Sequence, residues 1–335
     1  MVGPNGEGKT NLLEAMHYLL TLTTPRVSAD ATLIADGSEV AYVRGETQGL
    51  EGRTLIEIEL RRVGANRLQV NRSPVRRRRD LRKHVRAVFF GPHDLRVVQG
   101  EPGARRDFMD EALRSLWPPR ESVLNAYDRV LRQRNRLLKD WQGGGKPPGL
   151  DTWSEELAGS GADVIQARLE VVDAIAEAAS GGFEALSGDG MDVAYTPNIE
   201  GGQDPEEFRR RLTEREQDEL VRRITLAGPH RDDMRLGVKD LVVRGFASHG
   251  EAWGAALCLR LGLADAVTTT FRETPLLLVD DPFSALDPGR RDHVAAGLRE
   301  RGQVLVSVAD DADIPRDSRA IWRVRGGRVE VEDAA

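Results

Sequence analysis

The chain of 335 residues is long enough for about two domains, and 40% of its residues are apolar, which suffices for a buried core. Its only cysteine, Cys258, excludes an intramolecular disulfide and favours a reducing, cytoplasmic location. No stretch approaches the about 18–20 apolar residues of a membrane span. The net charge of −6 excludes a protein that is basic all over, but a nucleic-acid binder needs only one basic face.

The first ten residues contain the pattern G-x-x-x-x-G-K-[ST] of a phosphate-binding loop. Glycines let successive backbone N–H groups point at phosphate oxygens, Lys9 adds a charge for the β/γ-phosphates, and Thr10 offers a hydroxyl to Mg²⁺. Apolar residues follow at helical spacing over 11–20, which places a helix N-terminus against the nucleotide. The pattern predicts that the nucleotide is bound by Gly3, Pro4, Asn5, Gly6, Glu7, Gly8, Lys9 and Thr10.

A phosphate loop needs a β-strand that leads into it, and only Met1 and Val2 precede Gly3. Either that strand is missing from the sequence as given, or the loop lacks its normal support. If the start is misassigned, in-frame upstream codons should encode a strand that ends just before Gly3.

Residues 30–70 predict short strands, because apolar and polar side chains alternate over 54–61. The consecutive arginines that follow, together with a nearby lysine, predict contacts with the DNA backbone or, alternatively, a solvated loop. These cations are Arg76, Arg77, Arg78, Arg79 and Lys83. The apolar run over 85–90 is then expected to be a buried strand.

From residue 111 the pattern becomes helical, with an apolar stripe over 123–141. The same segment carries the cations Arg129, Arg132, Arg134, Arg136 and Lys139. This basic helical face is equally consistent with DNA contact and with simple solvation. A second helix is predicted over 152–179, ended by Gly181-Gly182, and a densely charged third helix over 205–224.

After residue 225 the α/β pattern returns. Helices are predicted over 251–267 and 288–301, and strands over 276–279 and 304–308. The fold class is therefore an α/β nucleotide-binding domain that is split in sequence. Its first part is expected over 1–105, an inserted helical domain over 106–224, and its second part over 225–335.

The apolar strand Leu276–Val279 ends in two carboxylates, Asp280 and Asp281. A strand tip beside a phosphate loop is where open α/β sheets bind ligands. Asp280 is suited to Mg²⁺, and Asp281 is suited to orient or deprotonate an attacking water. The alternative is a strand followed by an acidic turn.

Ser248, Gly250 and Glu251 open the helix predicted over 251–267. Alone they form only a capping pattern. Beside the phosphate loop and the double aspartate, they look like the signature of the ABC-type ATPases, in which the signature of one subunit closes on the ATP held by the other. This similarity implies an ATP-dependent homodimer with two composite sites.

The chain as a whole resembles the RecF family of recombination mediator ATPases. The phosphate loop and the helix that follows it are shared by many ATPases, but the combination with the other blocks is more specific. These blocks are Phe89–Leu95, Gly100–Asp110, Tyr127–Leu138, Gly228–Asp233 and Asp280–Asp287. The insert is too short for the long coiled coils of SMC-type relatives, which favours RecF over them. The resemblance implies an ABC-type P-loop ATPase head with an inserted helical domain.

The resemblance further implies binding of ATP and Mg²⁺, slow hydrolysis, and binding to single- and double-stranded DNA at gaps or junctions. It also implies work with RecO and RecR to place RecA on gaps, hence roles in DNA replication, repair and the SOS response. The sequence departs from the family in two places. Ala252-Trp253 follows the signature glutamate, where Gln-Arg or Gln-Lys is more usual. The strand over 304–308 is not followed by the histidine that is common in ABC switch loops, and Ser307 is the nearest candidate for its place. Two alternatives stay open: a related ATPase that acts on a non-DNA partner, and an inactive, N-terminally truncated chain.

Overall fold

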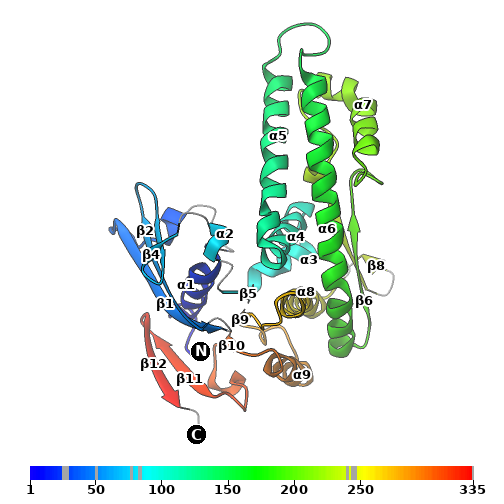
Figure 1. The fold of residues 1–335 in the computed structure, drawn as a ribbon. Coiled ribbons are helices and arrows are strands. Elements are labelled where there is room, and N and C mark those ends of the chain that lie inside the picture. The colour runs from blue at the N-terminus through cyan, green and yellow to red at the C-terminus, as the bar shows by residue number, and fades with distance from the viewer. Residues whose placement is uncertain are drawn as a thin grey trace. The chain divides into compact units, whose positions relative to one another are not determined.

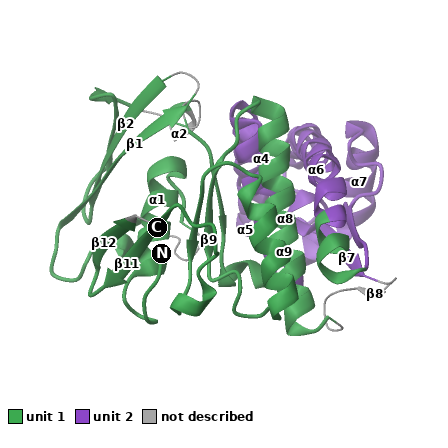
Figure 2. Cartoon of the chain, turned by 90° about the horizontal axis from the view of Figure 1, so that it is seen from below, with its two compact units in different colours: residues 1–95, 182–188, 247–335 green, residues 96–181, 189–246 purple. Residues whose placement is uncertain are grey.

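The computed structural model describes residues 1–24, 30–49, 52–75, 78–81, 85–238, 241–242 and 247–333. The chain forms two compact units (Figure 2). Unit 1 comprises residues 1–95, 182–188 and 247–335, and unit 2 comprises residues 96–181 and 189–246. No helix in the described part of the chain is long and apolar enough to cross a membrane.

The centre of unit 1 is a parallel sheet with strand order β10-β9-β5. Its strands are β5 (Ala87–Phe90), β9 (Leu276–Asp280) and β10 (Val304–Ser307). The register pairs Ser307 with Asp280 and Phe90 with Val279. All residues of β5 and nearly all of β9 are buried, as expected for a strand that is covered on both faces.

Helices α1 (Lys9–Thr21) and α8 (His249–Phe271) cover the two faces of this sheet (Figures 1 and 2). Successive strand side chains point to opposite faces, and the contacts of β5 follow this rule. Phe89 joins Leu13 of α1 and Leu278 in one apolar cluster. Phe90 meets Trp253 of α8 edge to face at 5.1 Å between ring centroids.

Unit 1 also contains an antiparallel sheet of four strands in sequence order. The strands are β1 (Val40–Gly49), β2 (Gly52–Arg61), β3 (Arg67–Val70) and β4 (Ser73–Pro74). The predicted alternation in β2 is confirmed, since Ile56, Ile58 and Leu60 are buried and pack with Tyr18 and Leu19 of α1. The remaining elements of the unit include α2 (Arg78–Leu81), α9 (Pro288–Arg299), β11 (Ala320–Arg325) and β12 (Arg328–Asp333).

Unit 2 combines helices with a small antiparallel sheet (Figure 1). The helices are α3 (Leu95–Gln99), α4 (Pro102–Leu116), α5 (Glu121–Asp140), α6 (Leu150–Ser187) and α7 (Pro205–Arg222). The strands are β6 (Met191–Thr196), β7 (Asp233–Val238) and β8 (Leu241–Val242). Because β7 pairs with β6 and packs on α4, residues 225–246 belong to this unit by contact.

Helix α6 does not end at Gly181-Gly182, so that prediction is wrong. The last residues of α6 belong to unit 1, where Phe183 is only 1% exposed. Gly254 of α8 lies so close that a Cβ there would stand 2.9 Å from Leu186. The burial of these apolar side chains outweighs the low helix propensity of two glycines.

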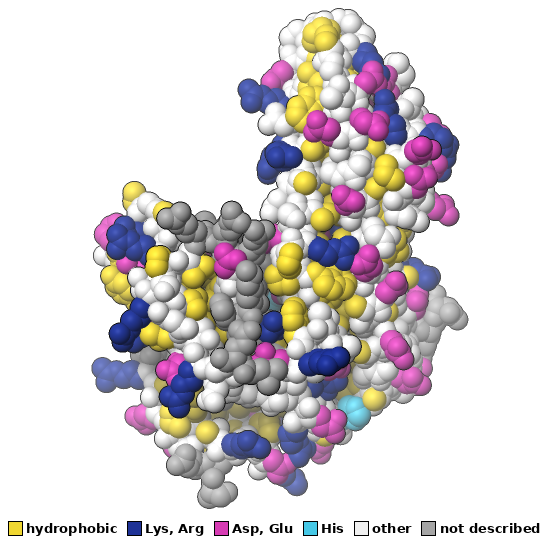
Figure 3. Space-filling view, in the orientation of Figure 1, with side chains coloured by type: hydrophobic (Ala, Val, Ile, Leu, Met, Phe, Trp, Pro, Cys, Tyr) yellow, Lys and Arg dark blue, Asp and Glu magenta, His cyan; other side chains and the backbone are white. Residues whose placement is uncertain are grey.

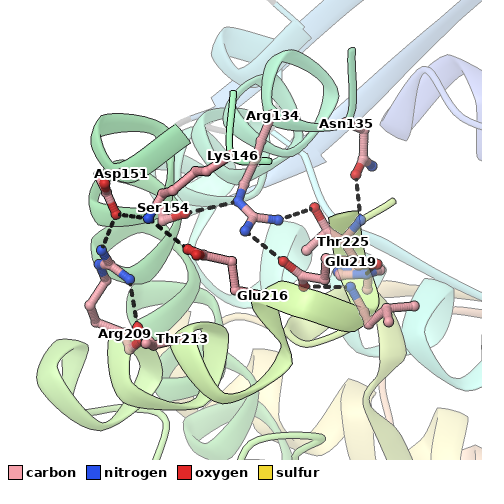
Figure 4. Close-up of polar contacts among 12 residues, drawn as sticks. Arg134, Asn135, Lys146, Asp151, Ser154, Arg209, Thr213, Glu216, Glu219 and Thr225 are labelled. Carbon is pink, nitrogen blue, oxygen red and sulfur yellow. Dashed lines mark hydrogen bonds and ion pairs between the residues drawn. The ribbon is translucent and has the colours of Figure 1, made fainter. Parts of the chain in front are cut away.

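Arg134 lies inside unit 2 and is 0% exposed (Figure 4). Its guanidinium donates to Glu219 at 2.6 Å, to Thr225 at 2.8 Å and to Ser154 at 3.1 Å. The other oxygen of the Glu219 carboxylate accepts from the Leu226 N–H at 2.8 Å. Arg134 was predicted to belong to a basic face that meets DNA or solvent, and this is wrong because its charge is buried and paired.

Asp232 of the Gly228–Asp233 block is also fully buried in unit 2. Its carboxylate accepts from Arg168 at 3.2 Å, from the Asn198 N–H at 2.7 Å, and from the Tyr195 hydroxyl. A buried charge is costly unless it is paired and hydrogen-bonded, and these three donors meet that need. The block therefore fastens α6 to the segment around β6 and β7.

His230 of the same block is held neutral by its surroundings. Its Nδ1 accepts from the Tyr127 hydroxyl at 2.7 Å, and its Nε2 donates to the Thr225 carbonyl at 3.2 Å. Burial lowers the pKa of His230 to about 4. Gly228 is required here, because a Cβ would lie 2.6 Å from the Tyr127 oxygen and φ is +132°.

We predict that Arg134→Met lowers the free energy of unfolding by about 3–5 kcal/mol, because Glu219 stays buried without its partner. Arg136→Met on the same helix removes an exposed ion pair with Asp140 and should change little. The double variant Arg134→Met/Glu219→Leu should recover part of the loss. Urea unfolding measures all three, and equal losses for Arg134→Met and Arg136→Met would contradict the prediction.

Candidate nucleotide-binding site

The phosphate loop is connected to the sheet of unit 1 through Met1 and Val2. The Val2 N–H donates to the Trp322 carbonyl, and the Val2 carbonyl accepts from the Val324 N–H, both at 2.9 Å. The Met1 carbonyl accepts from the Val308 N–H, also at 2.9 Å. No strand precedes the loop in the described residues, as the sequence indicates, but Val2 forms single parallel bridges with Val308 and Arg323. The loop therefore does not lack support, since hydrogen bonds hold the two residues before it on both sides.

The phosphate loop begins directly after Val2 and requires glycine at two positions, Gly3 and Gly8. A Cβ on Gly3 would stand 2.3 Å from the Val324 carbonyl oxygen, so only glycine allows this close approach. Gly8 has φ +104° and directly precedes α1. The Glu7 carboxylate accepts from the Gly326 N–H, and the Glu7 carbonyl accepts from the Gly327 N–H at 3.2 Å. The loop is thereby fixed to the turn between β11 and β12.

Lys9 is the first residue of α1 and is 8% exposed. Its ammonium group donates to the carbonyls of Gly3 at 2.5 Å and Pro4 at 2.9 Å. The side chain thus folds back over the loop, and its charge is held at the loop carbonyls of Gly3 and Pro4. This arrangement fits the predicted role of Lys9.

Asp280 connects three segments at the carboxyl end of β9. Its carboxylate accepts from the Thr10 hydroxyl of α1 at 2.8 Å and from the Ser307 hydroxyl of β10 at 2.5 Å. Asp280 is 4% exposed and Ser307 is 0% exposed. Because both donors are neutral hydroxyls, these hydrogen bonds leave the charge of the carboxylate uncompensated.

Asp281 forms a sharp corner after the strand. Its φ is +52°, in the left-handed region that Asp and Asn tolerate better than most residues. Its N–H donates to the hydroxyl of Ser307 at 3.1 Å. Burial raises the pKa of the Asp281 carboxyl, and the neighbouring Asp280 adds to this effect. The upward direction of this pKa shift favours the protonated carboxyl relative to an exposed aspartate.

Ser248, Gly250 and Glu251 begin α8 and form a capping box. The Ser248 hydroxyl accepts from the Glu251 N–H at 3.3 Å, and the Glu251 carboxylate accepts from the Ser248 N–H at 2.8 Å. A Cβ on Gly250 would lie 3.2 Å from the Ala285 carbonyl oxygen. The described contacts of Ser248 and Gly250 are thus to their own helix and to the turn at Ala285, rather than to the phosphate loop.

Two contacts that the sequence did not predict hold α8 in place within unit 1. Trp253 donates from Nε1 to the carbonyl of Pro282 at 2.9 Å, directly after the double aspartate. Arg260 donates to the Asp94 carboxylate at 2.7 Å, and this carboxylate also accepts from the Gly91 N–H at 3.0 Å. In the sequence, only the departure from the family pattern at Ala252-Trp253 and the acidic residue in the Phe89–Leu95 block could have indicated these two contacts.

The proposed DNA contacts are not tested by the structure. Arg76, Arg77 and Lys83 lie outside the described residues. Arg78 and Arg79 belong to the short helix α2. Among the predicted nucleotide ligands, Thr10 and Asp280 are in direct contact, and Lys9 and Asp281 lie in the same region of unit 1.

Comparisons with known proteins show the family to which the chain belongs. The family described as RecF/RecN/SMC N terminal domain matches residues 1–325. The DNA replication and repair protein RecF of Cutibacterium acnes is 38% identical, with 98% of this chain and 91% of the relative covered. RecF of Streptomyces avermitilis is 40% identical, with coverage of 94% and 88%.

Solved structures give the same result. The structure of "the recombination mediator protein RecF-ATP in RecFOR pathway" has a TM-score of 0.89 and 26% identity, with 99% of this chain and 90% of that chain covered. The SMC head domain of Pyrococcus furiosus, at 16% identity and a TM-score of 0.54, shares the fold of an ABC-type ATPase head. The chain therefore belongs to the RecF family of DNA replication and repair proteins.

Proposed function

We propose that this chain is an ATP-switched, DNA-binding recombination mediator that acts in the cytoplasm as a homodimer. In this proposal it binds DNA at gaps or junctions, cooperates with RecR and RecO to place RecA, and supports the SOS response. The convergence of Thr10, Asp280 and Ser307 at one strand end carries the proposal, together with about 40% identity to RecF proteins over nearly the whole chain.

ATP would be held by the loop Gly3–Thr10 and the N-terminus of α1. The residues fit a magnesium ion, because Thr10 and Asp280 present adjacent oxygens and Asp280 has only neutral hydroxyl donors in its hydrogen bonds. Mg²⁺ usually keeps several waters and takes one or two protein ligands. When bound there, it would neutralise charge on the β- and γ-phosphate oxygens.

Slow hydrolysis would depend on Asp281. Its raised pKa and its left-handed backbone at the strand end support a role in which the carboxylate orients a water and accepts a proton. Ser307 of the adjacent strand supports this role, since its hydroxyl donates to the Asp280 carboxylate and accepts from the Asp281 N–H.

Dimerisation would bring Ser248, Gly250 and Glu251 of one protomer to the ATP held by the other. The exposed position of Ser248 at the N-terminus of a 23-residue helix supports this, because its hydroxyl and the helix dipole favour an anion. Within this scheme the division of the chain into an ATPase domain over 1–105 and 225–335 and an insert over 106–224 stays a proposal from the sequence, although residues 96–105 and 225–246 pack within unit 2. Arg76–Arg79 and Lys83 are kept as proposed DNA contacts.

Lys9→Met is expected to weaken ATP binding roughly 10- to 100-fold, because a charge-assisted hydrogen bond to phosphate is lost. ATP-dependent dimerisation and retention on gapped DNA should be lost with it. A fluorescent ATP analogue and light scattering measure these effects. Lys146→Met, in unit 2, is the matched control and should bind ATP as the wild type does.

Asp281→Asn should lower ATP turnover by about 10²- to 10⁴-fold while ATP still binds, because Asn keeps the left-handed corner but cannot accept the proton. Since the pKa of Asp281 is raised, wild-type turnover should fall as the pH drops through that raised value. Single-turnover assays of phosphate release test both points. Unchanged turnover in Asp281→Asn would remove this residue from the mechanism.

Ser248→Asp and Ser248→Asn separate capping from anion binding, because Asp and Asn are both good N-cap residues. Both variants should melt like the wild type and bind ATP. Asp should abolish ATP-dependent dimerisation through repulsion of the phosphates, whereas Asn should impair it less. Equal dimerisation of the Asp variant and the wild type by light scattering would refute the composite site.

A further inference from the structure

The exposed face of α5 in unit 2 carries a row of cations that the nucleotide site does not use. Leu124, Tyr127, Val130, Arg134 and Leu138 are the buried side of this helix. On the other side, four exposed cations follow at spacings of three, four and three residues. These are Arg129, Arg132, Arg136 and Lys139, here called the α5 cation stripe.

Helix geometry places these side chains together. At 3.6 residues per turn the four positions fall within an arc of about 80°, and at 1.5 Å per residue they span about 15 Å of the helix. Figure 3 shows Lys and Arg side chains on the surface along α5. The four cations therefore share one side of the helix and are not distributed around it.

Helix α7 of the same unit shows what a merely solvated face looks like. Its four arginines over 209–215 all have carboxylate partners: Arg210 binds Glu207 at 2.6 Å, and Arg211 binds the same residue at 3.1 Å. Arg209 binds Asp151 at 2.8 Å, and Arg215 binds Asp218 at 3.9 Å. Such i,i+3 and i,i+4 pairs compensate the charge of a helix surface internally.

The α5 cation stripe lacks this compensation. Within the described residues, Arg129, Arg132 and Lys139 have no carboxylate at ion-pair distance, and only Arg136 is paired, with Asp140 at 3.4 Å. The chain as a whole carries a net charge of −6, so the unpaired cations do not follow from a general excess of positive charge. The only carboxylates over residues 128–140 are Asp128, which is not at ion-pair distance from the stripe, and Asp140. The four cations thus exceed the carboxylates on this helix segment, and like charges at i,i+4 are unfavourable, so an external anion is a partner that fits.

The stripe continues beyond α5 at its C-terminal end. Lys139 also lines an open hollow of about 840 Å³, together with Asp140, Gln142, Arg222, Arg223 and Ile224, so that three cations and one carboxylate surround it. Arg222 and Arg223 are exposed. The cationic surface is thus longer than the helix face alone, which suits an extended polyanion better than a small anion.

We propose that the α5 cation stripe binds the phosphate backbone of duplex DNA. This inference rests on the proposed function and names a DNA-contacting surface for it. One strand of B-DNA presents one charge per about 3.4 Å of axis, so 15 Å of helix faces about four phosphates. Arginine forks match phosphate oxygens. The only aromatic side chain of α5, Tyr127, is buried, so the face offers no stacking platform for single-stranded bases.

The test compares two triple variants of the full-length chain. Arg129→Gln/Arg132→Gln/Lys139→Gln removes the unpaired cations, and Arg210→Gln/Arg211→Gln/Arg215→Gln removes three paired cations from α7. Both change the net charge by the same amount. Binding to a duplex oligonucleotide in the presence of ATP is measured between 50 and 200 mM salt, with melting temperature and ATP binding as checks on folding.

The α5 variant should bind more weakly at low salt, and its slope of log K against log[salt] should be less steep by about 2.7 than that of the wild type. The wild type should then lose roughly 40-fold more affinity than this variant over the salt range. The α7 variant should keep the wild-type slope.

The outcomes separate the two proposals. If the wild type binds duplex DNA and the α5 and α7 variants share its slope, the inference is overturned and the stripe is assigned to an acidic protein partner. If the wild type does not bind DNA with ATP present, the proposed function itself fails.

Discussion

The hydrogen bonds of the Asp280 carboxylate are the interaction on which unit 1 depends. They join the helix after the phosphate loop, the strand that ends in the double aspartate and the neighbouring strand, through Thr10 and Ser307. A nearly buried carboxylate whose hydrogen-bond donors are neutral leaves a negative potential at the strand end. The same contact therefore serves two purposes: it aligns three segments that are far apart in sequence, and it provides the electrostatic setting that a divalent cation needs.

Much of this site could be predicted from the sequence, because most of its residues belong to short motifs whose local geometry is fixed. The phosphate loop, the apolar strand before Asp280 and the cap at Ser248 each depend on residues a few positions apart. What could not be predicted depends on contacts between distant segments. Three features depend on residues that are distant in sequence, so no local pattern predicts them. They are the support of the loop by Met1 and Val2, the continuation of α6 through two glycines, and the hydrogen bond of Trp253.

The burial of charged residues also depends on contacts between distant segments. In sequence, Arg134 was indistinguishable from the arginines around it, yet it is buried opposite Glu219 while its neighbours on α5 stay exposed. The Gly228–Asp233 block, which made the resemblance to RecF specific, acts inside unit 2 through Asp232 and His230. The described hydrogen bonds of this block thus have a packing role inside unit 2, where a buried charge must be paired and hydrogen-bonded.

Helix α8 is held by hydrogen bonds at three points within unit 1. Its first residues form the Ser248 cap, its second turn is bonded through Trp253 to the carbonyl of Pro282, and Arg260 further on is bonded to Asp94. The residue that follows Asp281 is therefore hydrogen-bonded to α8, so the strand end with the double aspartate and the N-terminal half of α8 are packed together within unit 1.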